Sequence, residues 1–175
     1  GDITRLYNIG SNTFLLFNLH DTLYFMSSRF NGTASNMGYP ELSVAFIFDM
    51  QNAGWSDLNG TFQFYKWDVK EYVTSGNGYH QFDGTSLPEA RTHGYPDAQL
   101  GYRLVAFTVN ATDLMSNSGE WSIMVNMTSS GQDMVKLDYF AVTEKVSYAH
   151  AFETVFWYNA NNVTEANVTQ ILFST

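Results

Sequence analysis

The chain has 175 residues, of which 45% are hydrophobic, 17% are aromatic and only 14% are charged. This length predicts one domain with a sizeable core, and the aromatic content excludes intrinsic disorder. The net charge of −9 has the wrong sign for a phosphate-binding surface, so we expect no nucleic-acid partner. Every apolar run is far shorter than the ~20 residues that span a bilayer, so we expect no membrane insertion.

Strand signals dominate the chain, and no long window has the apolar spacing of a helix. The apolar runs at residues 13–19 and 22–30 are separated by two residues, which predicts a β-hairpin. Further strands are predicted over residues 42–50, 61–67, 101–110, 121–127, 133–142, 146–159 and 168–173. Roughly nine or ten short strands indicate an all-β fold, an antiparallel β-sandwich or jelly roll.

One long region, residues 74–100, interrupts the strands. It contains Gly and Pro at many positions and several aromatic residues, so we expect it to pack as a lid over one sheet. No linker divides the rest of the chain. We therefore predict an N-terminal extension over residues 1–12 and a single β-sandwich domain over residues 13–175.

Six Asn-x-Thr sequons indicate an extracellular, cell-surface location. The 15 Asn and 31 Ser and Thr in 175 residues would give about three such patterns by chance. A Thr-rich β-protein with Asn in its turns is the alternative explanation. The predicted N-glycosylation sites are Asn31, Asn59, Asn110, Asn126, Asn162 and Asn167.

The chain lacks the patterns of common catalytic and metal sites. It has no cysteine and no Gly-x-Ser-x-Gly motif, and its 17 Asp and Glu have no spacing that selects an acid–base pair. His80 and His93 lie near Asp83 and Asp97, but solvated loop histidines explain them as well. We therefore predict no catalytic residue, no metal and no cofactor, and that the protein is not an enzyme; N-linked glycans are the expected attachment.

The tryptophans suggest a sugar-binding alternative. Trp55 and Trp121 are candidates for stacking on sugar rings, because flat apolar sugar faces pack on aromatic faces. Residues 119–125 and 135–142 resemble the closing hairpin of carbohydrate-binding β-sandwich modules. The competing explanation is that the aromatic side chains fill the core.

Both chain ends have strand-like sequences. Residues 2–9 precede a flexible break at Gly10, and the end of the chain over residues 168–175 carries no side-chain charge. Such an end must pair within its own sandwich or be donated to a neighbour's sheet. For donation we predict Ile3, Leu6 and Ile9 as the donor-strand residues and Gly10 as the hinge. A donated strand makes a head-to-tail contact and therefore a filament.

The chain lacks cysteine, has dense sequons, is rich in strand signals and starts at Gly1 without a signal-like segment. In these features it is similar to the subunits of archaeal extracellular filaments, the thread and bundling-pilus group. The resemblance implies a glycosylated β-sandwich subunit whose terminal strand inserts into the adjacent subunit. We therefore predict a structural subunit of a cell-surface filament, with copies of itself as partners. The alternative is a carbohydrate-binding module or adhesin with glycan ligands; a secreted hydrolase ranks last.

Overall fold

Ten strands form two antiparallel sheets in the part of the chain that the computed structural model describes, residues 15–26, 41–51, 54–117, 119–131, 133–147 and 155–159. In sheet A the order is β1 (Leu15–Asn18), β9 (Met134–Ser147), β3 (Glu41–Met50) and β7 (Arg103–Asn110), and β10 (Val155–Asn159) pairs with the end of β9. In sheet B the order is β2 (Thr22–Met26), β8 (Ser122–Thr128), β4 (Asn59–Lys66) and β5 (Glu71–Tyr72), and β6 (Tyr79–Asp83) also pairs with β4. The predicted all-β sandwich is confirmed.

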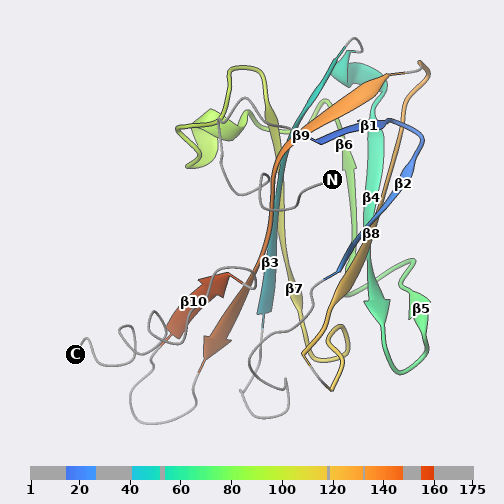
Figure 1. The fold of residues 1–175 in the computed structure, drawn as a ribbon, viewed down its shortest axis with the longest axis vertical. Helices are drawn as coiled ribbons and strands as arrows, with labels where there is room; N and C mark the ends of the chain where they lie inside the picture. The colour runs from blue at the N-terminus through green and yellow to red at the C-terminus, as the bar shows by residue number, and fades with distance from the viewer. Residues whose placement is uncertain are drawn as a thin grey trace.

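The core lies between the two layers, which stand side by side in Figure 1. Alternate residues of a strand point to opposite faces, so Leu42, Val44, Phe46, Phe48 and Met50 of β3 all point to sheet B and are buried. Sheet B contributes Phe62, Phe64, Ile123, Val125 and Met127. The rings of Phe46 and Phe62 meet edge to face, with centroids 5.3 Å apart. Each fully buried side chain of this kind stabilises the fold by about 1.5–3 kcal/mol.

One close approach in sheet B requires glycine. A Cβ atom on Gly60 would lie 2.1 Å from the ring of Phe82, which belongs to the neighbouring strand β6 and is 5% exposed. Gly60 therefore lets the Phe82 ring cross the backbone of β4 and reach the core.

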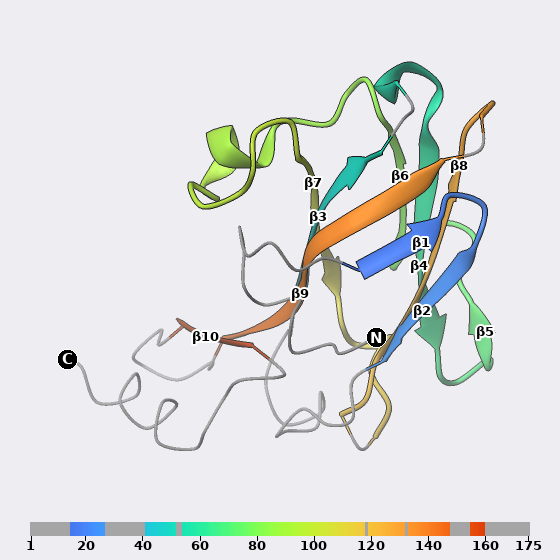
Figure 2. The same cartoon turned by 45° about the horizontal axis from the view of Figure 1, so that its top comes forward.

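The hairpin predicted over residues 13–19 and 22–30 is wrong in its pairing. The link between β1 and β2 is short, but β1 pairs with β9 in sheet A and β2 pairs with β8 in sheet B (Figure 2). The link is therefore a corner between the layers. The carboxylate of Asp21 holds this corner, since it accepts hydrogen bonds from the backbone N–H and the side-chain amide of Asn18, both at 3.2 Å.

The second predicted hairpin, over residues 119–142, is also wrong. β8 belongs to sheet B and β9 to sheet A, so the turn between them again crosses from one layer to the other. The resemblance to the closing hairpin of carbohydrate-binding modules therefore does not hold. The predicted strand at residues 168–173 lies outside the described residues.

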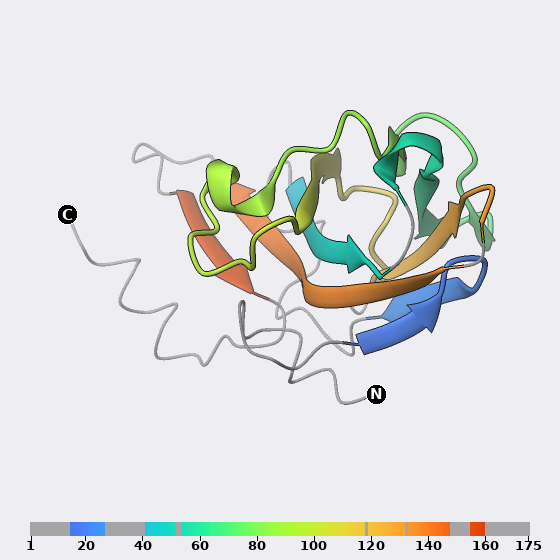
Figure 3. The same cartoon turned by 90° about the horizontal axis from the view of Figure 1, so that it is seen from above.

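Residues 74–100 are more ordered than predicted, since they contain β6 and a short 3-10 helix, η4 (Ala90–His93); a similar helix, η3 (Trp55–Asp57), precedes β4. Residues 88–102, which we call the η4 loop, lie against sheet A on the side away from sheet B (Figure 3). Ala90, Ala98 and Tyr102 of this loop are buried against Ile47 and Leu104. The predicted lid over one sheet is confirmed for residues 88–100 only, because residues 79–83 are a strand of sheet B.

Candidate functional site

The outer face of sheet A carries a grid of small side chains beside the η4 loop. Strand register places Ser43 of β3 between Thr108 of β7 and Thr143 of β9. The next outward row places Ala45 between Ala106 and Ala141 in the same way. Three strands thus contribute one row of hydroxyl groups and one row of methyl groups, which together form the floor of a groove.

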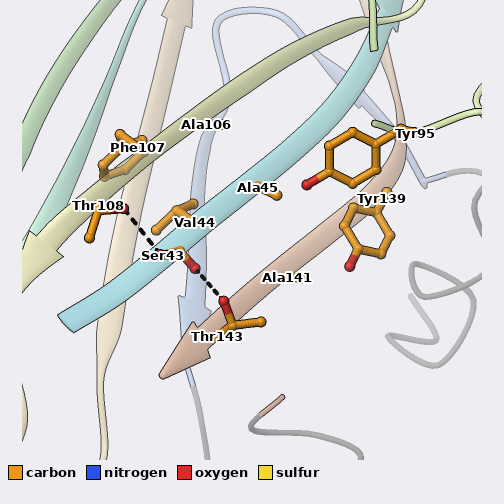
Figure 4. A pocket seen from close by; sticks show the side chains of 10 residues that line it. All are labelled: Ser43, Val44, Ala45, Tyr95, Ala106, Phe107, Thr108, Tyr139, Ala141 and Thr143. Carbon is orange, nitrogen blue, oxygen red and sulfur yellow. Dashed lines mark hydrogen bonds between the residues drawn. The ribbon is translucent and has the colours of Figure 1, made fainter. Parts of the chain in front are cut away.

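The hydroxyl row is connected by hydrogen bonds. The hydroxyls of Ser43 and Thr108 lie 3.1 Å apart, and the Thr143 hydroxyl donates to the Ser43 carbonyl at 3.4 Å (Figure 4). A hydroxyl has one donor and two acceptor sites, so each of the three keeps hydrogen-bonding capacity for a ligand.

Two tyrosine rings close one end of the groove. Tyr139 is the outward residue of β9 next to Ala141 of the methyl row, and Tyr95 comes from the η4 loop. Their ring centroids lie 5.9 Å apart, and the ring planes meet at 53°. Both hydroxyl groups point toward the side of the small residues in Figure 4. The backbone N–H of Ala90 donates to the Tyr102 carbonyl at 2.9 Å and closes the base of the η4 loop, whose buried side chains pack against sheet A. The fold therefore places a paired aromatic wall beside a floor of small side chains.

The groove is electrically neutral. It has a volume of about 320 Å³, and no charged side chain lines it among the described residues. Burial raises the pKa of the Tyr95 hydroxyl above its ordinary value, so this group stays protonated and can donate a hydrogen bond. Neighbouring Tyr102 behaves alike, since burial and the negative charges of Asp49 and Asp138 raise its pKa to about 12. Flat rings, neutral hydroxyls and a methyl floor suit an uncharged ligand with hydroxyl groups and apolar faces.

A second cavity, of about 300 Å³, lies between the edges of the two sheets. His80 and His93 both line it, and the ring of His80 stacks on Phe107 with centroids 4.2 Å apart. Burial lowers the pKa of His80, so its imidazole is neutral over most of the physiological range. Within the described residues, no group of three or more His, Cys, Asp or Glu is arranged to hold a metal ion.

The structure separates the two predicted sugar-stacking tryptophans from each other and from the groove. Trp121 is 2% exposed and its ring packs on Phe140 with centroids 6.2 Å apart, so the prediction that it stacks on sugars is wrong. Trp55 of η3 is partly buried against the core; Phe48 lies 5.3 Å from it, and the Arg103 guanidinium lies 5.5 Å from its ring centre. Neither residue lines the groove.

Three of the six predicted sequons lie among the described residues. Asn59 and Asn110 are exposed at a strand start and a strand end. Asn126 is partly buried on the outer face of sheet B, and both ends of its amide form hydrogen bonds with side chains of neighbouring strands. Asn31, Asn162 and Asn167 lie outside the described part of the chain. Glycosylation remains a prediction at all six.

The predicted strand-donation residues also lie outside the described part. Ile3, Leu6 and Ile9 and the hinge Gly10 belong to residues 1–14, and the predicted extension over residues 1–12 lies there as well. Donation between subunits therefore remains a prediction. None of the described helices is long and apolar enough to cross a membrane.

Sequence reasoning missed the groove residues. Alternation identified the two faces of each strand, but the grid depends on which small residues stand opposite each other across β7, β3 and β9. That alignment is a property of strand register, and no local pattern reports it. Tyr95 was placed only as part of an aromatic lid.

Comparisons with known proteins add little to this geometry. No family model matches the chain, and no curated protein matches it. Among solved structures, the chain is similar to the crystal structure of a carbohydrate-binding module, CBM28, described as specific for non-crystalline cellulose. The TM-score is 0.43 at 12% sequence identity, covering 73% of this chain and 71% of that chain. The function of this chain is therefore inferred from its own residues.

Proposed function

We propose that this protein binds neutral carbohydrate in the groove on sheet A and performs no chemistry on it. The observation that carries the proposal is the combination of the aromatic pair Tyr95 and Tyr139 with the uncharged floor of hydroxyl and methyl groups. A sugar ring has apolar C–H faces that pack on aromatic rings and equatorial hydroxyls that pair with Ser and Thr.

The shape and charge of the groove favour a neutral chain over other ligands. An acidic glycan would approach a protein of net charge −9 against repulsion and would find no cation in the described lining of the groove. The groove is open, so a polymer can lie across β7, β3 and β9 with its ends in solvent. Acid–base catalysis would need a positioned carboxylate or imidazole at the reacting bond, and the described residues that line the groove include neither, which favours binding.

Titration calorimetry with cello-, xylo-, manno- and laminarihexaose tests the proposal. At least one of these neutral hexasaccharides should bind, and Tyr95→Ala and Tyr139→Ala should each weaken binding tenfold or more, which corresponds to about 1.4 kcal/mol. Tyr95→Phe keeps the ring and should lose less. Ala106→Ile fills the groove without removing a contact and should also abolish binding.

Leu100→Ala is the matched control. Leu100 lies in the η4 loop and is 77% exposed, but it does not line the groove. This variant should bind like the parent protein. Circular dichroism of each variant checks that the fold is intact; a folded Ala106→Ile variant with unchanged affinity would show that the groove is not the binding site.

A saccharide-binding protein of this kind would act outside the cell, where polysaccharides are found, and the sequons agree with that location. Assembly into a filament concerns a different part of the chain and is compatible with binding, since a cell-surface fibre that binds glycans is an adhesin. None of the described residues favours that second function over the first.

A further inference from the structure

The outer face of sheet B carries a row of polar side chains joined by hydrogen bonds. The Thr22 hydroxyl of β2 donates to the Asn126 Oδ1 of β8 at 2.7 Å, and the Asn126 Nδ2 donates to the Gln63 Oε1 of β4 at 3.3 Å. The Gln63 Nε2 then donates to the Val73 carbonyl at 3.0 Å. The row therefore crosses the sheet and fixes the orientation of both amide groups.

These amides are not saturated. Each NH₂ group has two donors and each carbonyl oxygen has two acceptor sites, and the row uses one donor and one acceptor of Asn126. A fixed amide with one donor and one acceptor left can pair with two adjacent hydroxyl groups of a ligand.

A strip of four aromatic rings lies beside the amide row. Tyr24 of β2 lies 5.7 Å from Tyr72 of β5, Tyr72 lies 5.2 Å from Tyr65 of β4, and Tyr65 lies 5.1 Å from Trp67, all measured between ring centroids. The Tyr72 hydroxyl is hydrogen-bonded to the Ser122 hydroxyl at 2.8 Å, which holds its ring over β8. Tyr24 is 59% exposed, so the strip opens to solvent at β2.

This face is uncharged along the three adjacent strands β2, β8 and β4. By register, the outward residues of β2, β8 and β4 are Thr22, Tyr24, Met26, Ser122, Met124, Asn126, Thr128, Asn59, Thr61, Gln63 and Tyr65. None of these described residues carries a charge, although the protein has a net charge of −9. An uncharged face with oriented amides and open rings is matched to a ligand that is neutral and rich in hydroxyl groups.

We propose that the outer face of sheet B is a second binding site for neutral saccharide, so that one chain holds two saccharide chains on opposite sides of the sandwich. The Tyr24–Tyr72–Tyr65 strip packs against sugar faces, and Asn126 and Gln63 pair with sugar hydroxyls. The second site extends the proposed function from binding to cross-linking of polysaccharide. It is built from different residues than the groove, so the two sites can be tested independently. It also requires Asn126 to be unglycosylated.

The test uses the full chain expressed without N-glycans, together with the hexasaccharides named above. Calorimetry should give two ligands per chain. Tyr24→Ala should reduce the stoichiometry to one, because it removes the exposed end of the strip, and Gln63→Ala should weaken the same site at least fivefold. Tyr139→Ala should remove the other site only. Val69→Ala, which removes a side chain that is 55% exposed outside the strip, is the control and should still bind two.

The outcomes separate the two proposals. One ligand per chain that is lost in Tyr139→Ala and kept in Tyr24→Ala overturns the second site and leaves the groove. One ligand that is lost in Tyr24→Ala and kept in Tyr139→Ala supports the second site and overturns the groove. If Tyr24→Ala instead changes only the oligomeric state in analytical ultracentrifugation, the strip is a contact between copies of the chain and the proposal is wrong. Glycan mass on Asn126 of native protein also overturns it.

Discussion

Replacing Ile47 tests whether the η4 loop, and with it Tyr95, is positioned by the small cluster on the outer face of sheet A. Ile47 is fully buried and packs against Ala90, Ala98, Tyr102 and Leu104. Ile47→Ala removes three carbon atoms, worth about 2.4 kcal/mol at ~0.8 kcal/mol each, and leaves a cavity, so the free energy of unfolding should fall by about 2–5 kcal/mol. Ile47→Val removes one carbon and should cost about 0.5–1.5 kcal/mol.

The part of the fold that loses stability in Ile47→Ala is as informative as the size of the change in unfolding free energy. Next to the cluster, two backbone hydrogen bonds close the base of the η4 loop, from Ala90 N–H to the Tyr102 carbonyl at 2.9 Å and from Leu104 N–H to the Pro88 carbonyl at 3.0 Å. Urea unfolding gives the global change, and native-state hydrogen exchange gives the local one. The amides of Ala90 and Leu104 should lose more protection than those of β4 and β8, and saccharide affinity should fall with them. Equal loss of protection in both sheets, or unchanged affinity, would show that the cluster around Ile47 does not position the η4 loop.

Two further predictions concern other parts of the chain. Hydrogen bonds from the Ser130 hydroxyl and N–H hold the pKa of the Asp57 carboxyl below its usual value, so they stabilise the fold above about pH 4 and the effect is lost as the pH falls through the lowered pKa. Ser130→Ala should therefore move the midpoint of acid unfolding to higher pH, with Ser56→Ala as the exposed control; equal midpoints would contradict the role of this contact. Deleting residues 1–9 should leave soluble subunits that form no fibres in electron micrographs, whereas fibres from the truncated chain would rule out that end as the donor.

The fold class followed from sequence because it depends on local alternation. Phe46 and Phe48 of β3 had to face one way, and they do. The sheet that each strand joins could not be predicted in the same way. The short link between β1 and β2, residues 19–21, is compatible with a hairpin or with a corner between the layers. In the structure it is a corner, and Leu19 within it is fully buried.

The candidate site was harder to predict for a related reason. Trp121 was a candidate for sugar stacking because its ring is large and aromatic. A large ring next to a strand can equally pack in the core, and the Trp121 ring does so. Ala45, Ala106 and Ala141 were not candidates for the site, because a methyl side chain has no hydrogen-bonding or acid–base group that a sequence pattern could indicate. They belong to the site because strand register places them side by side, next to Tyr139. The η4 loop places Tyr95 beside Tyr139.

In the proposed site, neutral saccharide lies on the grid of Ser43, Ala45, Thr108 and Thr143 against the two tyrosines. Two-dimensional NMR of the full chain, titrated with the hexasaccharide that binds, tests it most directly. We expect saturable shifts of the amide signals of β3, β7 and β9 at these rows and of Tyr95 in the η4 loop. A titration that saturates without moving any of these signals would contradict it.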